Sequence, residues 1–174
     1  LTVKNVTLLS AIDESNFEQI FGVASAPTVT VFATEEDYKA NNGQAVDATA
    51  GPIAITSPYV KVSGFIQNPI SYNPAVAVDL NVYLNGAYIK TTGNTPCINY
   101  VPANGKVKVT ASKDTVNAIY NTFAEETTPE LTESDGIKSE NNIRIEAKNG
   151  SILYITSAIG DGIDGGEVKI TDTK

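Results

Sequence analysis

Apolar and polar residues alternate with a period of two along most of the chain. The clearest example is Val76-Ala-Val-Asp-Leu-Asn-Val-Tyr-Leu84, where valine or leucine occupies every second position. This period, combined with many β-branched residues, is typical of strands that bury one side. The runs predicted as strands are 1–8, 28–32, 53–55, 59–63, 76–84, 106–110, 143–147, 152–155 and 168–170. Many short strands separated by turn residues predict a mainly β protein, a sandwich or a barrel.

Asn-Gly pairs mark the predicted turns between these strands. Asn85-Gly86 and Asn149-Gly150 each stand between two apolar runs, and Asn104-Gly105 precedes a third. An Asn-Gly pair tolerates the positive φ angles of a type I′ turn, which joins two antiparallel strands. The pattern therefore predicts β-hairpins at these positions.

Three short helices are predicted among the strands. Ser15-Asn-Phe-Glu18 has the spacing of a capping box, and Thr34-Glu-Glu-Asp37 opens a second short helix. The third is expected from Asp114 to about Glu125, because its apolar residues recur at helical spacing. Those residues are Val116, Ile119, Tyr120 and Phe123.

The segment 125–142 is rich in acidic residues and poor in apolar ones, which predicts a solvated loop or a linker. It divides a main domain, 1–124, from a C-terminal segment, 143–174. A segment of that length is too short for a core of its own. We expect it to pack on the main domain or on a neighbouring subunit. No convincing internal repeat is evident.

The middle of the chain resembles bacterial immunoglobulin-like surface modules. The resemblance rests on Val82-Tyr-Leu-Asn-Gly-Ala-Tyr-Ile-Lys-Thr-Thr92 and on Asn99-Tyr-Val-Pro-Ala-Asn-Gly-Lys-Val-Lys-Val-Thr-Ala111. It implies an antiparallel, immunoglobulin-like β-sandwich into which the two or three short helices are inserted.

Composition narrows the possible chemistry. The chain has no histidine, no tryptophan, a single arginine (Arg144) and a single cysteine (Cys97). Histidine-based catalysis and thiolate metal clusters are therefore excluded. The net charge of −8 argues against nucleic acid as a partner. Cys97 follows a proline in an apolar stretch, with no cation adjacent in sequence, so a buried, inert thiol is expected.

One acidic, glycine-rich segment is a candidate metal site. Asp161, Asp164 and Glu167 lie within seven residues of one another, between glycines. Calcium prefers several hard oxygen ligands, and such a loop can supply them. The alternative is an ordinary hairpin loop in which Asp and Gly serve the turn geometry.

Tyrosines near the predicted central strands are candidate ligand-binding residues. Tyr59, Tyr83 and Tyr88 would present their rings to a sugar if they shared one exposed face. The alternative is that they are packing residues, as aromatic residues in strands usually are.

These observations favour a non-enzymatic structural subunit of an extracellular filament, surface layer or virus particle. It would assemble with itself or with other subunits through the edges of its sheets. The alternative is an adhesin module that binds glycans or a receptor, with calcium as its one candidate cofactor. Either protein is expected to be extracellular, on a cell surface or in a virion. Neither requires insertion into a membrane.

Overall fold

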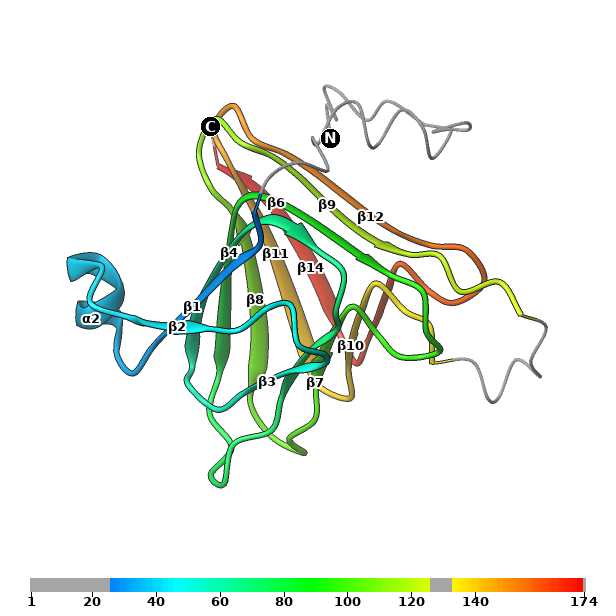
Figure 1. The fold of residues 1–174 in the computed structure, drawn as a ribbon, viewed down its shortest axis with the longest axis horizontal. Coiled ribbons are helices and arrows are strands. Elements are labelled where there is room, and N and C mark those ends of the chain that lie inside the picture. Colours follow the sequence, from blue (N-terminus) through cyan, green and yellow to red (C-terminus); the bar gives the residue numbers. More distant parts are fainter. Residues whose placement is uncertain (1–25, 126–132, 174) are drawn as a thin grey trace.

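The computed structural model describes residues 26–125 and 133–173, and it is built almost entirely of strands (Figure 1). The elements are β1 (Thr28–Phe32), α2 (Glu35–Ala40), β2 (Gln44–Val46), β3 (Ile53–Ile55), β4 (Tyr59–Ile66), β5 (Ile70–Tyr72), β6 (Leu80–Thr91), β7 (Ile98–Tyr100), β8 (Lys106–Ala111), β9 (Val116–Asn121), β10 (Ile137–Ser139), β11 (Asn142–Lys148), β12 (Ile152–Ser157), β13 (Ile163–Gly165) and β14 (Val168–Thr173).

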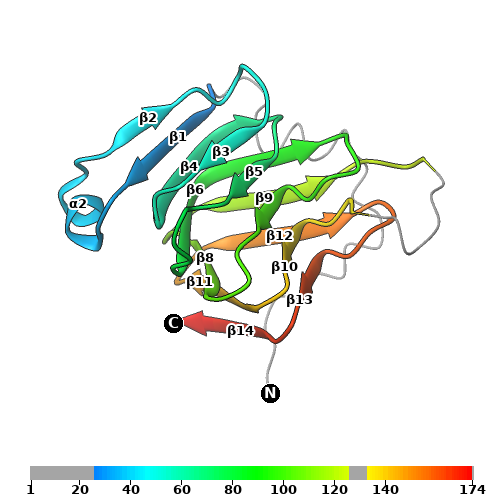
Figure 2. The same cartoon turned by 90° about the horizontal axis from the view of Figure 1, so that it is seen from below.

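The chain winds in successive coils that stack on one another (Figure 2). Strands at the same position in neighbouring coils pair in parallel, which creates three faces. The first face has the order β14-β11-β8-β6-β4, and the second is formed by β12, β9 and the C-terminal parts of β6 and β4. The third face is a separate sheet with the order β13-β10-β7-β5-β3. This arrangement is a parallel β-helix.

The expected antiparallel, immunoglobulin-like sandwich is therefore wrong. Every pair in the third face is parallel, and the antiparallel pairs of the larger sheet are β1 with β2 and β1 with β4. Alternation shows that one side of a strand is buried, but it does not show the direction of the neighbouring strand. The pattern alone could not separate the two architectures.

The predicted hairpins at the Asn-Gly pairs are wrong for the same reason. Gly86 and Gly150 do have positive φ angles, of 70° and 74°. Each lies at a corner of a coil, where the chain turns onto the next face without reversing. Gly86 lies inside the long strand β6, and Gly150 lies between β11 and β12, which pair with different neighbours.

The three helix predictions had different outcomes. The helix after Thr34 is confirmed as α2, and the Thr34 side chain accepts a hydrogen bond from the backbone N–H of Asp37. The helix predicted at 114–125 is wrong, because this segment contains β9. The helix predicted at Ser15 and the strand predicted at 1–8 lie outside the described residues.

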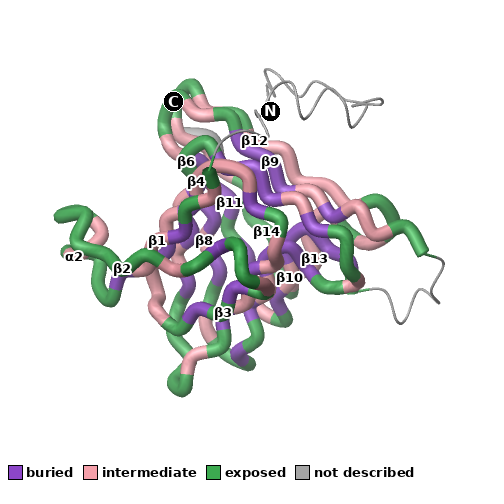
Figure 3. Tube along the Cα trace, viewed as in Figure 1, coloured by how far each residue is buried: buried purple, intermediate pink, exposed green. Residues whose placement is uncertain are grey.

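Buried residues recur along the strands of successive coils (Figure 3), and similar residues at matching register positions form rows inside the β-helix. Each row places one apolar side chain on the next at the strand spacing of about 4.8 Å. Rows on the third, second and first faces are, in that order, Ile53-Ile70-Ile98-Ile137-Ile163, Ile66-Ile89-Ile119-Ile155 and Val60-Val82-Val109-Ile145-Ile170.

Two buried asparagines on β9 hold the corners beside the second face. Asn117 Oδ1 accepts hydrogen bonds from the backbone N–H groups of Gly86 and Ala87, at 2.9 and 3.0 Å. Asn121 Nδ2 donates to the backbone oxygens of Gly93 and Thr95, at 3.2 and 2.7 Å. Both side chains are fully buried. The two side chains form hydrogen bonds with backbone N–H and C=O groups that do not pair with a neighbouring strand, because the chain bends there.

The two ends of the stack differ. At the N-terminal end, β1 and β2 add two strands to the first face, and buried Ala48 packs against the core. At the C-terminal end, the last inward-facing residues, Val168 and Ile170, are 40% and 70% exposed. Within the described residues, β2 is therefore the outermost strand at the first end, and β14, with its exposed apolar residues, is the outermost strand at the second end.

Residues after the predicted linker continue the same stack. β11 pairs with β8, β12 pairs with β9, and β10, within the segment 125–142, pairs with β7. None of the helices within the described ranges has the length and apolar character needed to cross a membrane.

Candidate functional site

The three carboxylates predicted as calcium ligands lie around β13 at the C-terminal end of the stack. Asp164 lies on β13 and forms an ion pair with Lys138, at 3.4 Å. Glu167 precedes β14 and accepts a hydrogen bond from Asn142 Nδ2, at 3.3 Å. Among residues 26–125 and 133–173, no group of three acidic, cysteine or histidine side chains is arranged to hold a metal ion. Calcium binding by Asp161, Asp164 and Glu167 stays a prediction that titration calorimetry can test.

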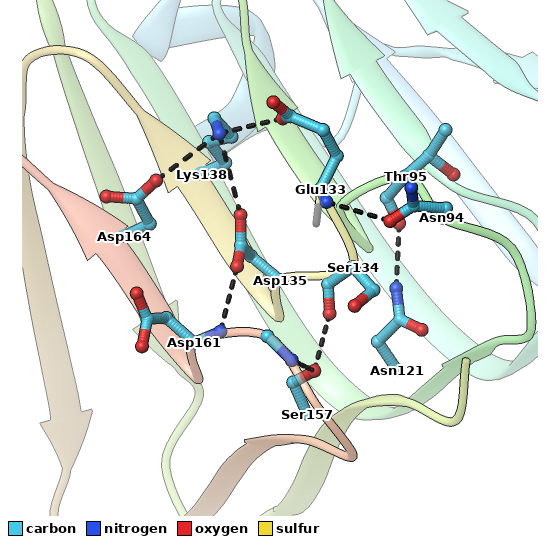
Figure 4. Close-up of polar contacts among 11 residues, drawn as sticks. Asn94, Thr95, Asn121, Glu133, Ser134, Asp135, Lys138, Ser157, Asp161 and Asp164 are labelled. Carbon is cyan, nitrogen blue, oxygen red and sulfur yellow. Dashed lines mark hydrogen bonds and ion pairs between the residues drawn. The ribbon is translucent and has the colours of Figure 1, made fainter. Parts of the chain in front are cut away.

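The structure assembles a different polar cluster, around Lys138 on β10 (Figure 4). Lys138 Nζ lies 2.7 Å from a Glu133 oxygen, 3.4 Å from Asp164 and 3.8 Å from Asp135. Asp135 is only 3% exposed, and its Oδ1 accepts a hydrogen bond from the backbone N–H of Asp161 at 2.9 Å. The cluster therefore links the corners of two successive coils.

The charge state of this cluster follows from its surroundings. Burial raises the pKa of Asp135, whose Oδ2 has no hydrogen-bond partner in the described structure. The hydrogen bond to Glu133 raises the pKa of Lys138, so this lysine remains protonated. A lysine held in its cationic form is a poor base and a poor nucleophile. The arrangement is that of a buried ion cluster that stabilises a corner.

The three tyrosines predicted to bind a ligand do not share one face. Tyr59 and Tyr83 lie on the outer side of the first face, on neighbouring strands β4 and β6. Tyr88 lies beyond the corner at Gly86, on the second face, and is 1% exposed.

Two of these rings are covered by aromatic neighbours. Tyr38 of α2 stacks on Tyr83 with ring centroids 3.9 Å apart, and Phe65 stacks on Tyr88 at 5.1 Å. Burial raises the pKa of Tyr83 to about 12. These stacked rings contribute to packing on the outer surface of the β-helix.

A row of cations runs along the outer side of the first face toward its β14 edge. Lys108, Arg144 and Lys169 are register partners on β8, β11 and β14, so neighbouring Cα atoms are about 4.8 Å apart. Lys108 is neutralised by buried Glu146, at 2.5 Å, but no ion pair of Arg144 or Lys169 is seen within the described ranges. We call Lys108, Arg144 and Lys169 the basic row.

An open groove lies beside the basic row. Its cavity volume is about 220 Å³, and it is lined by Lys106, Asn142, Ile143, Arg144, Glu167 and Lys169. Three of the six lining residues are cations in a protein whose net charge is −8. This end of the first face therefore combines exposed positive charge with the exposed apolar residues of β14.

Cys97 is buried, as expected. Its Sγ lies 3.1 Å from Thr91 Oγ1, and its side chain contributes to the inward core. Burial raises the pKa of this thiol to about 11. At neutral pH the residue is therefore a protonated, inaccessible thiol.

Sequence analysis missed both the coils and the cluster around Lys138, although one signal of them was present. Asp135-Gly-Ile137 recurs as Asp161-Gly-Ile163, 26 residues later. In the structure the two segments stack, and the N–H of Gly136 donates to the backbone oxygen of Asp161 at 2.9 Å. A Cβ at Gly136 would come within 2.5 Å of the Gly162 oxygen, which explains the small residue. Such a repeat is the sequence signature of stacked coils.

Comparison with known proteins gives no relative for this chain. No protein-family model, no curated protein and no solved structure matches it. The function is therefore inferred from the fold, from the exposed edge of β14 and from the cations of the basic row beside it.

Proposed function

We propose that this protein is a structural subunit whose copies associate through the exposed edges of their sheets. The observation that carries the proposal is the exposed edge of β14, the outermost strand of the first face within the described residues. There, β14 has a neighbour, β11, on one side only within the described residues. An edge strand of this kind offers backbone N–H and C=O groups to another strand.

The exposed apolar residues at this end support the same proposal. Ile170 continues the inward row of Val109 and Ile145, yet it is 70% exposed, whereas Ile145 is 4% exposed. An added strand would bury Ile170 and Val168 as the coils bury their counterparts. Covering apolar area in this way favours association.

The chemistry of the chain supports an assembly function over catalysis. The cluster around Lys138, of which Asp135 is the buried member, surrounds a protonated lysine. The stacked rows of isoleucine and valine repeat from coil to coil, and a body built of repeated coils suits a filament, a surface layer or a virus particle.

The alternative function, binding of glycans or a receptor, has less support from the geometry. The rings of Tyr83 and Tyr88 are covered by Tyr38 and Phe65, so they offer little open surface to a sugar. A glycan array, run with and without a chelator, tests this alternative. Strong binding to one glycan by a protein that stays monomeric would favour it.

The structural proposal is tested by substituting Ile170. We expect wild-type protein to associate as its concentration rises in analytical ultracentrifugation. Ile170→Lys should raise the concentration of half-association at least about tenfold, because it places a charge on the surface to be buried. The substitution should leave the fold intact, since the side chain is 70% exposed.

Val76→Lys is the matched control, because Val76 is 74% exposed and lies away from both ends of the sheets. It should associate as the wild type does. A wild-type chain that remains monomeric at every concentration would contradict the proposed function.

A further inference from the structure

We infer that copies of this protein associate head to tail, an inference that rests on the proposed function. The β14 edge and the basic row of one copy meet β2 and the acidic helix α2 of the next copy. The assembly would therefore have one direction, and opposite charges would face each other at each junction between copies.

The strand directions allow this arrangement. β2 is antiparallel to β1, and β1 is antiparallel to β4, so β2 runs in the same direction as β4. The pairs from β4 through β6, β8 and β11 to β14 are all parallel. The strands at the two ends of this sheet, β2 and β14, therefore point the same way. A copy displaced along the stack brings its β2 beside β14 as another parallel strand.

The inward residues of the two edges also correspond. Val46 on β2 is the register partner of Val29, which belongs to the core, so Val46 lies on the inward side of its strand. On β14 the inward residues are Val168 and Ile170. Pairing of the two strands would bring Val46 beside an apolar residue of β14, whereas Gln44, the other inward position of β2, is polar.

Helix α2 lies over the first face, which also carries the basic row. One continuous outer row of register partners runs Phe32-Tyr59-Asn81-Lys108-Arg144-Lys169. α2 begins three residues after Phe32, and Tyr38 packs edge-to-face on Phe32, with ring centroids 5.4 Å apart. The same Tyr38 ring stacks on Tyr83, which fixes the helix against the outer side of this face.

The two ends of this outer row carry opposite charges. The first turn of α2 contains Glu35, Glu36 and Asp37, of which Glu35 and Glu36 are exposed. At the other end, Arg144 and Lys169 are exposed. Displacing a copy along the stack brings its acidic helix toward the Lys169 end of its neighbour. Opposite charges orient such an encounter, and a chain of net charge −8 otherwise repels its own copies.

The charges also disfavour a tail-to-tail pair of copies. In such a pair two β14 edges would meet, and Arg144 and Lys169 would face the same cations of the second copy. Juxtaposed like charges disfavour an interface. The head-to-tail arrangement is the one that places each cation near an acidic group.

The test uses charge reversal at each end, measured by sedimentation of the 174-residue chain. Arg144→Glu with Lys169→Glu makes both ends acidic, and Glu35→Lys with Glu36→Lys makes both ends basic. Each double variant alone should associate at least about tenfold more weakly than the wild type. All four residues are exposed, so the variants should fold, which circular dichroism verifies.

Mixing the two variants distinguishes this interface from a general effect of charge. In an equimolar mixture, every acidic end can meet a basic end, so association should return toward the wild-type value. Raised salt should weaken association of both the mixture and the wild type, because exposed charges are screened. Arg144→Glu alone is compared with Lys113→Glu, which makes the same charge change at a 70% exposed lysine outside both surfaces. Only Arg144→Glu should weaken association.

The outcomes separate this inference from the proposed function. If the wild type associates but the helix variant associates equally well, the head-to-tail inference is overturned and the structural function stands. Failure of the mixture to recover also overturns the inference. A wild type that never associates overturns both.

Discussion

Glu146 shows how a single residue couples this fold to pH. It is 4% exposed on the outer side of the first face and lies between Lys108 and Lys148, both of which form ion pairs with it. The hydrogen bonds from Lys108 and then Lys148 lower its pKa to about 2. The carboxylate is therefore charged in the folded protein at any pH where the unfolded glutamate is charged.

The stability due to Glu146 should be fully present above about pH 4.5 and should be lost as the pH falls toward 2. The sign follows because the unfolded glutamate takes up a proton at a higher pH than the folded one. Glu146→Gln should lower the free energy of unfolding at neutral pH by about 1–3 kcal/mol. Urea unfolding across this pH range measures both effects. Equal pH dependence of wild type and variant below pH 4.5 would contradict the assignment.

Cys97 gives a second prediction at the residue scale. Its burial and raised pKa should leave the native thiol unreactive toward a disulfide reagent at neutral pH. One thiol per chain should react rapidly once denaturant unfolds the protein. Rapid labelling of the native chain would show that this part of the core opens readily.

At the scale of elements, the corners of the coils depend on buried amides. Asn117→Ala removes the acceptor of the Gly86 and Ala87 N–H groups, which the bend in β6 leaves without regular strand partners. We expect a loss of about 2–3 kcal/mol in unfolding free energy, since unsatisfied buried donors are costly.

Asn81→Ala is the matched control, because that side chain makes one long contact, 3.5 Å, with the Pro58 oxygen. The control should cost less than about 1 kcal/mol. Equal effects of the two substitutions would contradict the role given to Asn117.

Some elements were predictable from local pattern. The runs 28–32 and 53–55 coincide with β1 and β3, because a half-buried strand shows its alternation within a few residues. The helix after Thr34 was predictable from its capping residue.

The segment that contains β9 was wrongly predicted as a helix because the inward residues of this strand include Asn117 and Asn121. Polar residues at core positions broke the period of two and left Val116, Ile119 and Tyr120 at helical spacing. Val116 is in fact 36% exposed, while Ile119 is fully buried. Those asparagines point inward and form hydrogen bonds with backbone groups at the corners. These corners exist only once the whole coil has folded.

At the scale of the whole molecule, two different ends give the described part of the protein a direction. At the N-terminal end β1 and β2 extend the first face and Ala48 packs against the core, whereas the described C-terminal end exposes Val168 and Ile170. An object with two different ends polymerises in one direction if each end fits the other. The association proposed above therefore predicts polar assemblies, and the Ile170 and charge-reversal experiments test it at this scale.

The sequence by itself determined which residues face the interior in the strands that alternate cleanly, where the chain bends at the Asn-Gly pairs, and that the chemistry of histidine is excluded. These properties depend on residue type and local spacing, which are fixed along the chain. Only the tertiary structure decided that the strands pair in parallel and that the coils stack. It also brought Lys138 to Glu133 and Asp164, and Arg144 to Lys108 and Lys169. These partners lie up to a whole coil away in sequence, and alternation is the same for parallel and antiparallel neighbours, so no local pattern could specify them.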